Sequence, residues 1–287
     1  MKRAFLKAAR IIAKISPLSL KMMGSRLPFS KFSKLISRLF WGEDIIRWHN
    51  VSVRVNPGRL HDYFLFFFGF YKEAEINKLI ELCRTSRVFA DVGANTGLFS
   101  LAVACACPEL EVFAFEPDRD SAGDFRFNLG LNPGVSERVH IVQKAVVEKD
   151  SDLFFSPSTD RTEIETGKVI EDTLHCASDY QVSGARLDAF FRRIGKYPDV
   201  VKIDVEGAEL RVLQGMKGLF EIGFPKSMLI EVHPSGFKND CLSHKMQIKS
   251  LLEESNYALF LYDKGRQKEL PTSEQWADCL HILAFRK

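Results

Sequence analysis

The sequence lacks the features that mark several protein classes. It contains no run of about 18 apolar residues, so no membrane-spanning helix is predicted. Its six cysteines form no Cys-x-x-Cys pair and no other motif calls for a metal, so no metal site is predicted, and reduced thiols are expected, as in the cytoplasm. Internal repeats and low-complexity tracts are absent. What remains is a chain of 287 residues, 46% hydrophobic, which is long enough to bury a substantial core.

Charge is distributed unevenly along the chain. Residues 1–47 carry 11 lysines and arginines but only two acidic residues, whereas the rest of the chain carries 29 basic and 35 acidic residues. A mildly acidic body therefore follows a basic N-terminal segment. Because the body has no basic bias, we do not expect it to bind nucleic acid.

The basic N-terminal segment has the pattern of an amphipathic helix. Lysines and arginines recur every three or four residues through residues 1–15, beside an apolar face, and Pro17 is expected to end the helix. Peripheral contact of residues 1–40 with an anionic membrane, packing on the body or a partner, and a mitochondrial presequence are all compatible with this pattern. Basic residues interrupt the apolar stretch, which argues against a secretory signal. We predict an arm over residues 1–50 and one domain over residues 51–287.

The body alternates between strand-like and helix-like segments. This order predicts an α/β fold with a mainly parallel sheet covered by helices on both faces, and the last two strands, which have no helix between them, predict an antiparallel edge. The polar stretch from Ser151 to Gly184 is expected to be either a substrate-facing insertion or a surface loop. The expected strands are 51–55, 88–90, 111–115, 139–142, 200–203, 227–232, 257–262 and 279–285, and the expected helices are 73–83, 98–107, 119–131, 186–194, 209–219 and 245–254.

A glycine-containing turn follows the second of these strands. Residues 88–97 read Val-Phe-Ala-Asp-Val-Gly-Ala-Asn-Thr-Gly. Glycine lets the backbone approach a nucleotide-like ligand, but a simple strand-to-helix turn needs glycine as well. A carboxylate at this place would repel a pyrophosphate and suits a ligand with a cationic, amino-bearing end, such as S-adenosylmethionine (SAM). We therefore predict that Asp91, Gly93, Asn95 and Gly97 bind SAM.

Two further positions are predicted to border the adenosine of that ligand. Glu116 follows the next strand, where a carboxylate can accept hydrogen bonds from both ribose hydroxyls. A carboxylate here can also cap a helix, although Asp118 is the better candidate for that role. Ala145, after the strand 139–142, is placed near the adenine ring by the same reasoning, on a weak signal.

Acidic residues and a histidine follow the next two strands. Residues 202–209 read Lys-Ile-Asp-Val-Glu-Gly-Ala-Glu, so that Asp204 and Glu206 lie in the turn and Glu209 opens a helix, where it favours the helix dipole. Glu231 and His233 lie on one face at the end of the strand 227–232. Clustered carboxylates raise one another's pKa, and a histidine beside them can accept a proton, so we predict Asp204, Glu206 and His233 as catalytic residues. A purely structural role for His233 remains open. Groupings of acidic residues with a histidine can also bind a divalent metal, although no motif here demands one.

Together these segments resemble the FkbM-type SAM-dependent methyltransferases over roughly residues 51–285. The most distinctive segment is 202–209, because many SAM-dependent enzymes share the glycine turn. The resemblance implies a Rossmann-like, seven-stranded class I methyltransferase sheet, mainly parallel with an antiparallel edge strand. It also implies SAM as methyl donor and O-methylation of a hydroxyl on a sugar, glycan or natural-product-like acceptor. The N-terminal arm lies outside this resemblance.

Two other functions compete with methyl transfer. A nicotinamide dehydrogenase needs a Gly-x-Gly-x-x-Gly turn, whereas this chain has Gly93 and Gly97 four residues apart with an acid in front. A non-catalytic, membrane-associated SAM-binding protein on the same scaffold is the alternative, because a fold does not guarantee activity. The acids after three strands favour an enzyme, expected in the cytoplasm and possible at the membrane surface.

Overall fold

The computed structural model describes residues 43–56, 62, 64–66, 69–157, 168–170, 179–233, 241–269 and 281–287. The predicted N-terminal helix and its membrane contact lie outside these residues, so both stay predictions. The described residues belong to two units, one ending at Glu73 and one beginning at Ala74, and each is described separately. No helix among the described residues is long and apolar enough to cross a bilayer.

The first unit contains a β-hairpin of β1 (Asp44–Trp48) and β2 (Val51–Val55), which pair antiparallel. The two residues between them, His49 and Asn50, both have positive φ angles, as a tight two-residue hairpin turn requires. Strand β2 was predicted, because its apolar residues alternate with polar ones. Strand β1 was not predicted, and it lies inside the segment that we expected to be an arm.

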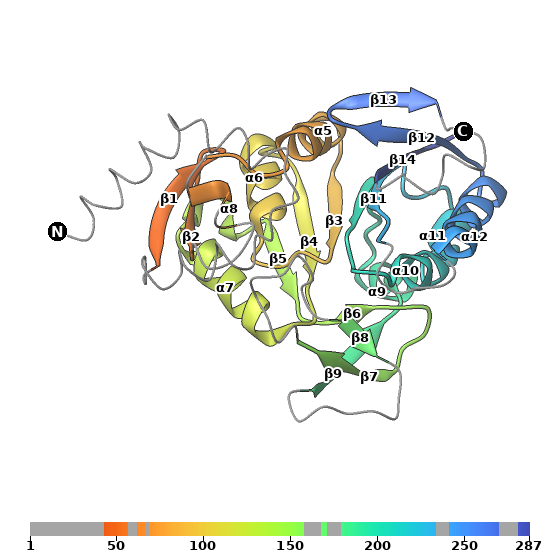
Figure 1. Cartoon of the computed structure of the whole chain (residues 1–287), viewed down its shortest axis with the longest axis horizontal. Coiled ribbons are helices and arrows are strands. Elements are labelled where there is room, and N and C mark those ends of the chain that lie inside the picture. Colours follow the sequence, from red (N-terminus) through yellow and green to blue (C-terminus); the bar gives the residue numbers. More distant parts are fainter. Residues whose placement is uncertain are drawn as a thin grey trace. The chain divides into compact units, whose positions relative to one another are not determined.

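The second unit is built on an eight-stranded sheet, drawn in Figure 1. Five strands run parallel in the order β11-β10-β3-β4-β5, and β14 pairs antiparallel with β11 on one side and with β12 on the other. The strands are β3 (Val88–Val92), β4 (Glu111–Phe115), β5 (Val139–Val142), β10 (Val200–Ile203), β11 (Ser227–Glu231), β12 (Tyr257–Asp263), β13 (Arg266–Glu269) and β14 (His281–Arg286).

The prediction of a mainly parallel α/β sheet is confirmed, but the prediction of seven strands is wrong. The eighth strand is β13, which folds back on β12 and forms the edge of the sheet. Its four residues are all exposed, and all four are charged or amide-bearing and follow a Lys-Gly turn, so no apolar pattern marked it as a strand. The predicted antiparallel strand at the end of the chain, β14, lies inside the sheet between β11 and β12.

Helices cover both faces of this sheet. One hydrophobic core joins β3, β10 and β11 to α9, α10, α11 and α12. Helix α6 connects β3 to β4, and α7 lies between β4 and β5 in the chain (Figure 1). The helices are α5 (Glu73–Cys83), α6 (Leu98–Ala106), α7 (Arg119–Gly130), α8 (Pro133–Ser136), α9 (Leu187–Ile194), α10 (Glu209–Gln214), α11 (Lys217–Glu221) and α12 (Cys241–Glu254).

Local chemistry explains where two of these helices begin and end. Asp118 caps α7 as expected, since its carboxylate accepts hydrogen bonds from the backbone N–H groups of Asp120 and Ser121. The single helix predicted over 209–219 is two helices, α10 and α11. Gly215 lies between them, and a Cβ there would lie 2.2 Å from the carbonyl oxygen of Val147, so the backbone turns where only glycine fits.

The polar stretch from Ser151 to Gly184 contributes to a second, smaller sheet rather than to a simple loop. Its order is β6-β9-β7-β8, with β6 (Ala145–Val146), β7 (Asp152–Ser156), β8 (Lys168–Ile170) and β9 (Tyr180–Ala185). Alternate side chains of β7 and β9, among them Leu153, Phe155 and Val182, form a separate small core. The strands are short, two to six residues each, so none was recognised alone, and only pairing gives them a common face.

The strand order indicates where a ligand is expected to bind. From β3 the chain proceeds to β4 and β5 on one side, whereas β10 and β11 extend from β3 on the other. In such sheets ligands bind at the carboxyl ends of the strands where the order reverses. Here that point lies between β3 and β10, the two strands followed by the predicted donor turn and the predicted acidic turn.

Candidate active site

The turn after β3 has the backbone conformation that its glycines allow. Gly93, Asn95 and Gly97 have φ angles of 80°, 51° and 84°, in the left-handed region. The N–H groups of Gly93 and Ala94 both donate to the carbonyl oxygen of Phe115, at 3.0 Å each, which ties the turn to the end of β4. The turn is thus held in one shape between two parallel strands.

The same turn lies against the acidic turn after β10. A Cβ on Gly93 would lie 1.8 Å from the carbonyl oxygen of Asp204, and the Asp204 N–H donates to the carbonyl of Val92 at 3.0 Å. A Cβ on Gly97 would lie 2.2 Å from the ring of Phe125 in α7. Both glycines are therefore required by close packing, whether or not a ligand is bound.

Asp91 lies within β3 and not after it, because the strand continues to Val92. Its carboxylate is fully buried, accepts a hydrogen bond from Ser100 at 2.7 Å and forms an ion pair with Lys202 at 3.1 Å. Lys202 is the cross-strand neighbour of Asp91 on β10, and its ammonium also donates to the carbonyl of Gly93 at 3.2 Å. Direct contact of Asp91 with a ligand stays a prediction, while the structure gives this carboxylate a part in holding the turn.

Glu116 lies at the carboxyl end of β4, and its carboxylate joins two loops. One oxygen accepts the N–H of Asn95 at 2.8 Å and the other accepts the N–H of Asp118 at 2.9 Å. Burial raises the pKa of Glu116 to about 7, although both backbone hydrogen bonds lower it. Each carboxylate oxygen retains a second lone pair, so the group can accept further hydrogen bonds.

The small sheet contributes to the surroundings of Glu116. The Tyr180 hydroxyl of β9 donates to the carboxylate of Asp118 and accepts the N–H of Arg119 at 3.1 Å, while the Arg119 guanidinium lies 4.4 Å from the tyrosine ring centre. Ala145, predicted to border the adenine, is the first residue of β6 and is the parallel partner of Gly184 in β9. Its role toward a ligand stays a prediction.

The three predicted catalytic side chains lie together. One oxygen of Asp204, one oxygen of Glu206 and one nitrogen of His233 all lie within 4.8 Å of one another. The His233 Nε2 is 3.7 Å from Asp204 Oδ1 and 3.5 Å from Glu206 Oε2. Glu206 has a φ of 52°, which is uncommon for a residue other than glycine and turns this segment back toward β11.

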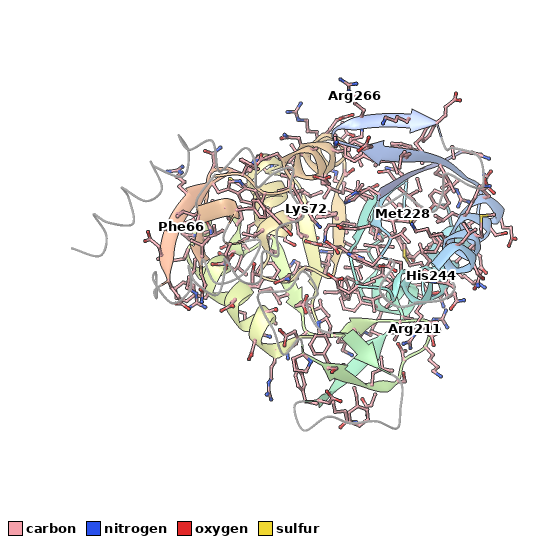
Figure 2. All side chains as sticks on the ribbon, in the orientation of Figure 1. Phe66, Lys72, Arg211, Met228, His244 and Arg266 are labelled. Atoms are coloured by element: carbon pink, nitrogen blue, oxygen red, sulfur yellow. The ribbon has the colours of Figure 1, made fainter. Side chains whose placement is uncertain are left out.

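A third carboxylate fixes the His233 ring. His233 Nδ1 lies 2.9 Å from Glu209 Oε1, and Glu209 is fully buried, with further contacts to the N–H of Gly207 at 2.9 Å and to His244 Nε2 at 3.4 Å. His244, labelled in Figure 2, comes from α12. Burial alone would lower the pKa of His233, but the hydrogen bond to Glu209 and the charges of Asp204 and Glu206 raise it to about 9.

Several residues of the site were not predicted from the sequence. Lys202 is a lysine within the apolar strand Val-Val-Lys-Ile, which was the available signal for a buried ion pair. Glu209 was interpreted as a helix-dipole residue, and only the fold brings it to His233. Glu231, which the sequence places on the same strand face as His233, lies 3.6 Å from His233 Nε2. His281 of β14, which was not predicted, lies 3.3 Å from Glu231 at the border of the site.

Comparison with known proteins connects this site to a family. Residues 91–261, about 60% of the chain, match the family described as Methyltransferase FkbM domain. The matched range begins at the buried aspartate of β3 and ends within β12, so it includes both turns of the site.

Individual relatives cover part of the chain. It is 30% identical over 166 residues to the hexuronic acid methyltransferase AglP of Haloferax volcanii, covering 55% of this chain and 61% of that protein. It is 28% identical over 143 residues to the 2-O-methyltransferase NoeI of Sinorhizobium fredii, covering 45% of this chain and 57% of that protein. The alignments thus span about 60% of these relatives. A solved FkbM methyltransferase from Methylobacillus flagellatus aligns with a TM-score of 0.45 at 16% identity, over 78% of this chain and 52% of that one.

Proposed function

This chain belongs to the FkbM methyltransferase family, and on that premise we propose that it transfers the methyl group of SAM to a hydroxyl group of a sugar, glycan or natural-product-like acceptor. The observation that carries the proposal is the junction of two turns at the reversal of the strand order. One turn carries the left-handed glycines and is held by Glu116 from the end of β4, and the other carries Asp204 and Glu206. A donor half and an acceptor half are thereby in direct contact.

The donor half has the polar groups that SAM requires. Glu116 holds its carboxylate at the end of β4 by two backbone N–H groups, and its remaining lone pairs suit the two ribose hydroxyls. Burial raises the pKa of this carboxyl, so hydrogen-bond donors from a ligand would stabilise its charged form. Gly93, Asn95 and Gly97 shape the adjoining loop, and Ala145 is assigned to the adenine edge.

Asp91 and Lys202 have a positioning role in this proposal. Lys202 connects the Asp91 carboxylate to the carbonyl of Gly93, so the ion pair fixes the first residue of the donor turn. A buried pair of this kind sets backbone position before any ligand arrives, which lowers the cost of ordering the loop on binding.

The acceptor half supplies a route for the proton. When bound, SAM supplies an electrophilic methyl group, and the site must align it with the acceptor oxygen. A hydroxyl is a weak nucleophile until its proton is removed. With its pKa near 9, His233 already carries a proton at neutral pH, so Asp204 and Glu206 are the better proton acceptors and His233 positions them.

The relatives support an oxygen acceptor on a sugar. One is named as acting on a hexuronic acid and another as a 2-O-methyltransferase. We extend that acceptor class to this chain. Sugars offer neighbouring hydroxyls, and the turns after β10 and β11 carry several carboxylates that can accept hydrogen bonds from them.

Two measurements on the full chain test this function. Titration calorimetry with SAM should give saturable binding, and Glu116→Ala should weaken that binding at least tenfold. The exposed Glu253→Gln in α12 is the matched control and should bind as the unaltered protein does. Labelled-methyl transfer from SAM into fractionated glycans and small molecules then identifies the acceptor class.

The alternative is a SAM-binding protein without catalysis. SAM binding with no label transferred to any acceptor fraction would favour it. Equal SAM affinity of the unaltered chain and Glu116→Ala would instead contradict the proposed donor site.

A further inference from the structure

The spacing of Asp204, Glu206 and His233 is unusual for side chains that simply contact one another. The two separations from His233 Nε2, 3.5 and 3.7 Å, exceed the length of a good hydrogen bond. Ligands on an octahedral cation with bonds of about 2.1 Å stand about 3.0 Å apart when adjacent and about 4.2 Å apart when opposite. The two separations from His233 Nε2 lie between these values.

The histidine ring is also oriented as a metal ligand is. Its Nδ1 is committed to Glu209 at 2.9 Å, which directs Nε2 toward Asp204 and Glu206. Histidine ligands in proteins typically donate their other ring N–H to a carboxylate, and that carboxylate is itself held by further hydrogen bonds. Glu209 meets this description, because Gly207 and His244 both contact it.

Charge at the cluster favours a cation. Asp204, Glu206, Glu209 and Glu231 surround one imidazole at distances from 2.9 to 3.7 Å. Lys202 lies 3.6 Å from Asp204 and is shared with Asp91. Several carboxylates around one imidazole form an acidic environment that a dication would stabilise.

From this geometry we propose that Asp204, Glu206 and His233 bind one divalent cation of the Mg²⁺ or Mn²⁺ class in the acceptor half of the site. Carboxylates suit these ions, and one imidazole shifts the preference toward Mn²⁺. This departs from the sequence-based expectation of no metal, because no short motif unites a turn after β10 with a residue after β11. The catalytic use of the ion rests on the proposed methyltransferase function, whereas its binding does not.

Three protein ligands leave about three positions on a six-coordinate cation. Two neighbouring oxygens of the acceptor, such as vicinal hydroxyls or a hydroxyl beside a carboxylate, would fill two of them. A bound cation displaces the proton from His233 Nε2 and lowers the pKa of a coordinated hydroxyl. Because Asp204 and Glu206 are then occupied as ligands, the hydroxyl proton passes to water, and the oxygen forms its bond to the methyl carbon as the carbon–sulfur bond breaks. The site therefore selects acceptors with paired oxygens.

The test is a titration of the full chain with Mn²⁺ alone, in which electron paramagnetic resonance measures free Mn²⁺. We expect about one saturable site per chain, with affinity reduced at least tenfold in Asp204→Asn and in His233→Ala. Glu209 does not contact the ion but holds the His233 ring, so Glu209→Gln should weaken Mn²⁺ binding about 10- to 100-fold. The control Glu253→Gln should leave Mn²⁺ affinity unchanged, and circular dichroism establishes that each variant is folded.

Each outcome has a defined meaning. No saturable binding at millimolar Mn²⁺, or equal binding by the folded variants and the unaltered chain, overturns the proposal. Glu206→Gln supplies a second ligand variant if Asp204→Asn does not fold. SAM calorimetry on the same samples separates the two ideas: SAM binding without Mn²⁺ binding refutes the cation alone, and Mn²⁺ binding without SAM binding refutes only the methyltransferase proposal.

Discussion

Replacing Lys202 by methionine should destabilise the protein strongly, because it leaves the Asp91 carboxylate buried without its cation. The side chains of Asp91 and Lys202 are 0% and 5% exposed, and their charged atoms are 3.1 Å apart. Removing one partner of a buried ion pair typically costs about 3–5 kcal/mol, whereas replacing both partners by uncharged groups costs much less. Ser100 would remain as a hydrogen-bond donor to Asp91, so the lower part of that range is expected.

The assay is thermal and urea unfolding of four proteins: unaltered, Lys202→Met, Asp91→Asn and the double variant. For a chain of this size, a loss of about 3–5 kcal/mol lowers the melting temperature by roughly 6–20 °C. The double variant should be more stable than the sum of the single effects predicts, by about 1–3 kcal/mol of coupling. Simple additivity, or a loss below about 1 kcal/mol in Lys202→Met, would refute the view that this pair is a buried, mutually dependent unit.

Four further outcomes are expected. Gly97→Ala should lower the free energy of unfolding in urea by about 2–4 kcal/mol, because its Cβ would lie 2.2 Å from a phenylalanine ring. The control Gly195→Ala, at φ 67° with open space around it, should lower it by only about 1 kcal/mol. Equal losses of stability in the two variants would contradict this. SAM affinity measured by calorimetry should rise between about pH 6 and 8, because the Glu116 carboxyl, with its pKa near 7, ionises there and its charged form is the better acceptor; Glu116→Gln should flatten the profile. The same raised pKa implies that the stability contribution of this acid is present below its ordinary pKa and is lost as the pH rises through about 7. Tyr180→Phe should lower stability by about 1 kcal/mol and weaken SAM binding less than tenfold, through loss of the hydrogen bond to Asp118; unchanged SAM affinity would show that the tyrosine does not help to hold the ribose site.

The elements that were predicted with correct bounds have strong local signals. Strands β4, β5 and β10 are short apolar runs between turn residues, and α5 has apolar residues at helical spacing. The elements that were missed lack such signals. Strand β13 is wholly exposed, and the small sheet forms only when strands distant in sequence share one face.

The site shows the same division. Residues at the ends of β4, β10 and β11 were predicted, because in parallel sheets the carboxyl ends of strands lie at one edge. The prediction that Asp91 follows its strand did not anticipate its burial, since an acid at the end of an apolar run is normally exposed. Only the register of β3 against β10 places Lys202 beside it, across 111 residues of sequence.

The sequence by itself therefore determines the fold class, the family and the positions at which the donor and acceptor turns begin, because periodicity and glycine turns are properties of contiguous residues. The tertiary structure alone decides which charges meet. It buries Asp91 on Lys202, and it directs His233 toward Asp204 and Glu206 by way of Glu209. Such partnerships depend on strand register and on packing between elements far apart in the chain, and these distances of a few ångströms set the pKa values of Glu116 and His233.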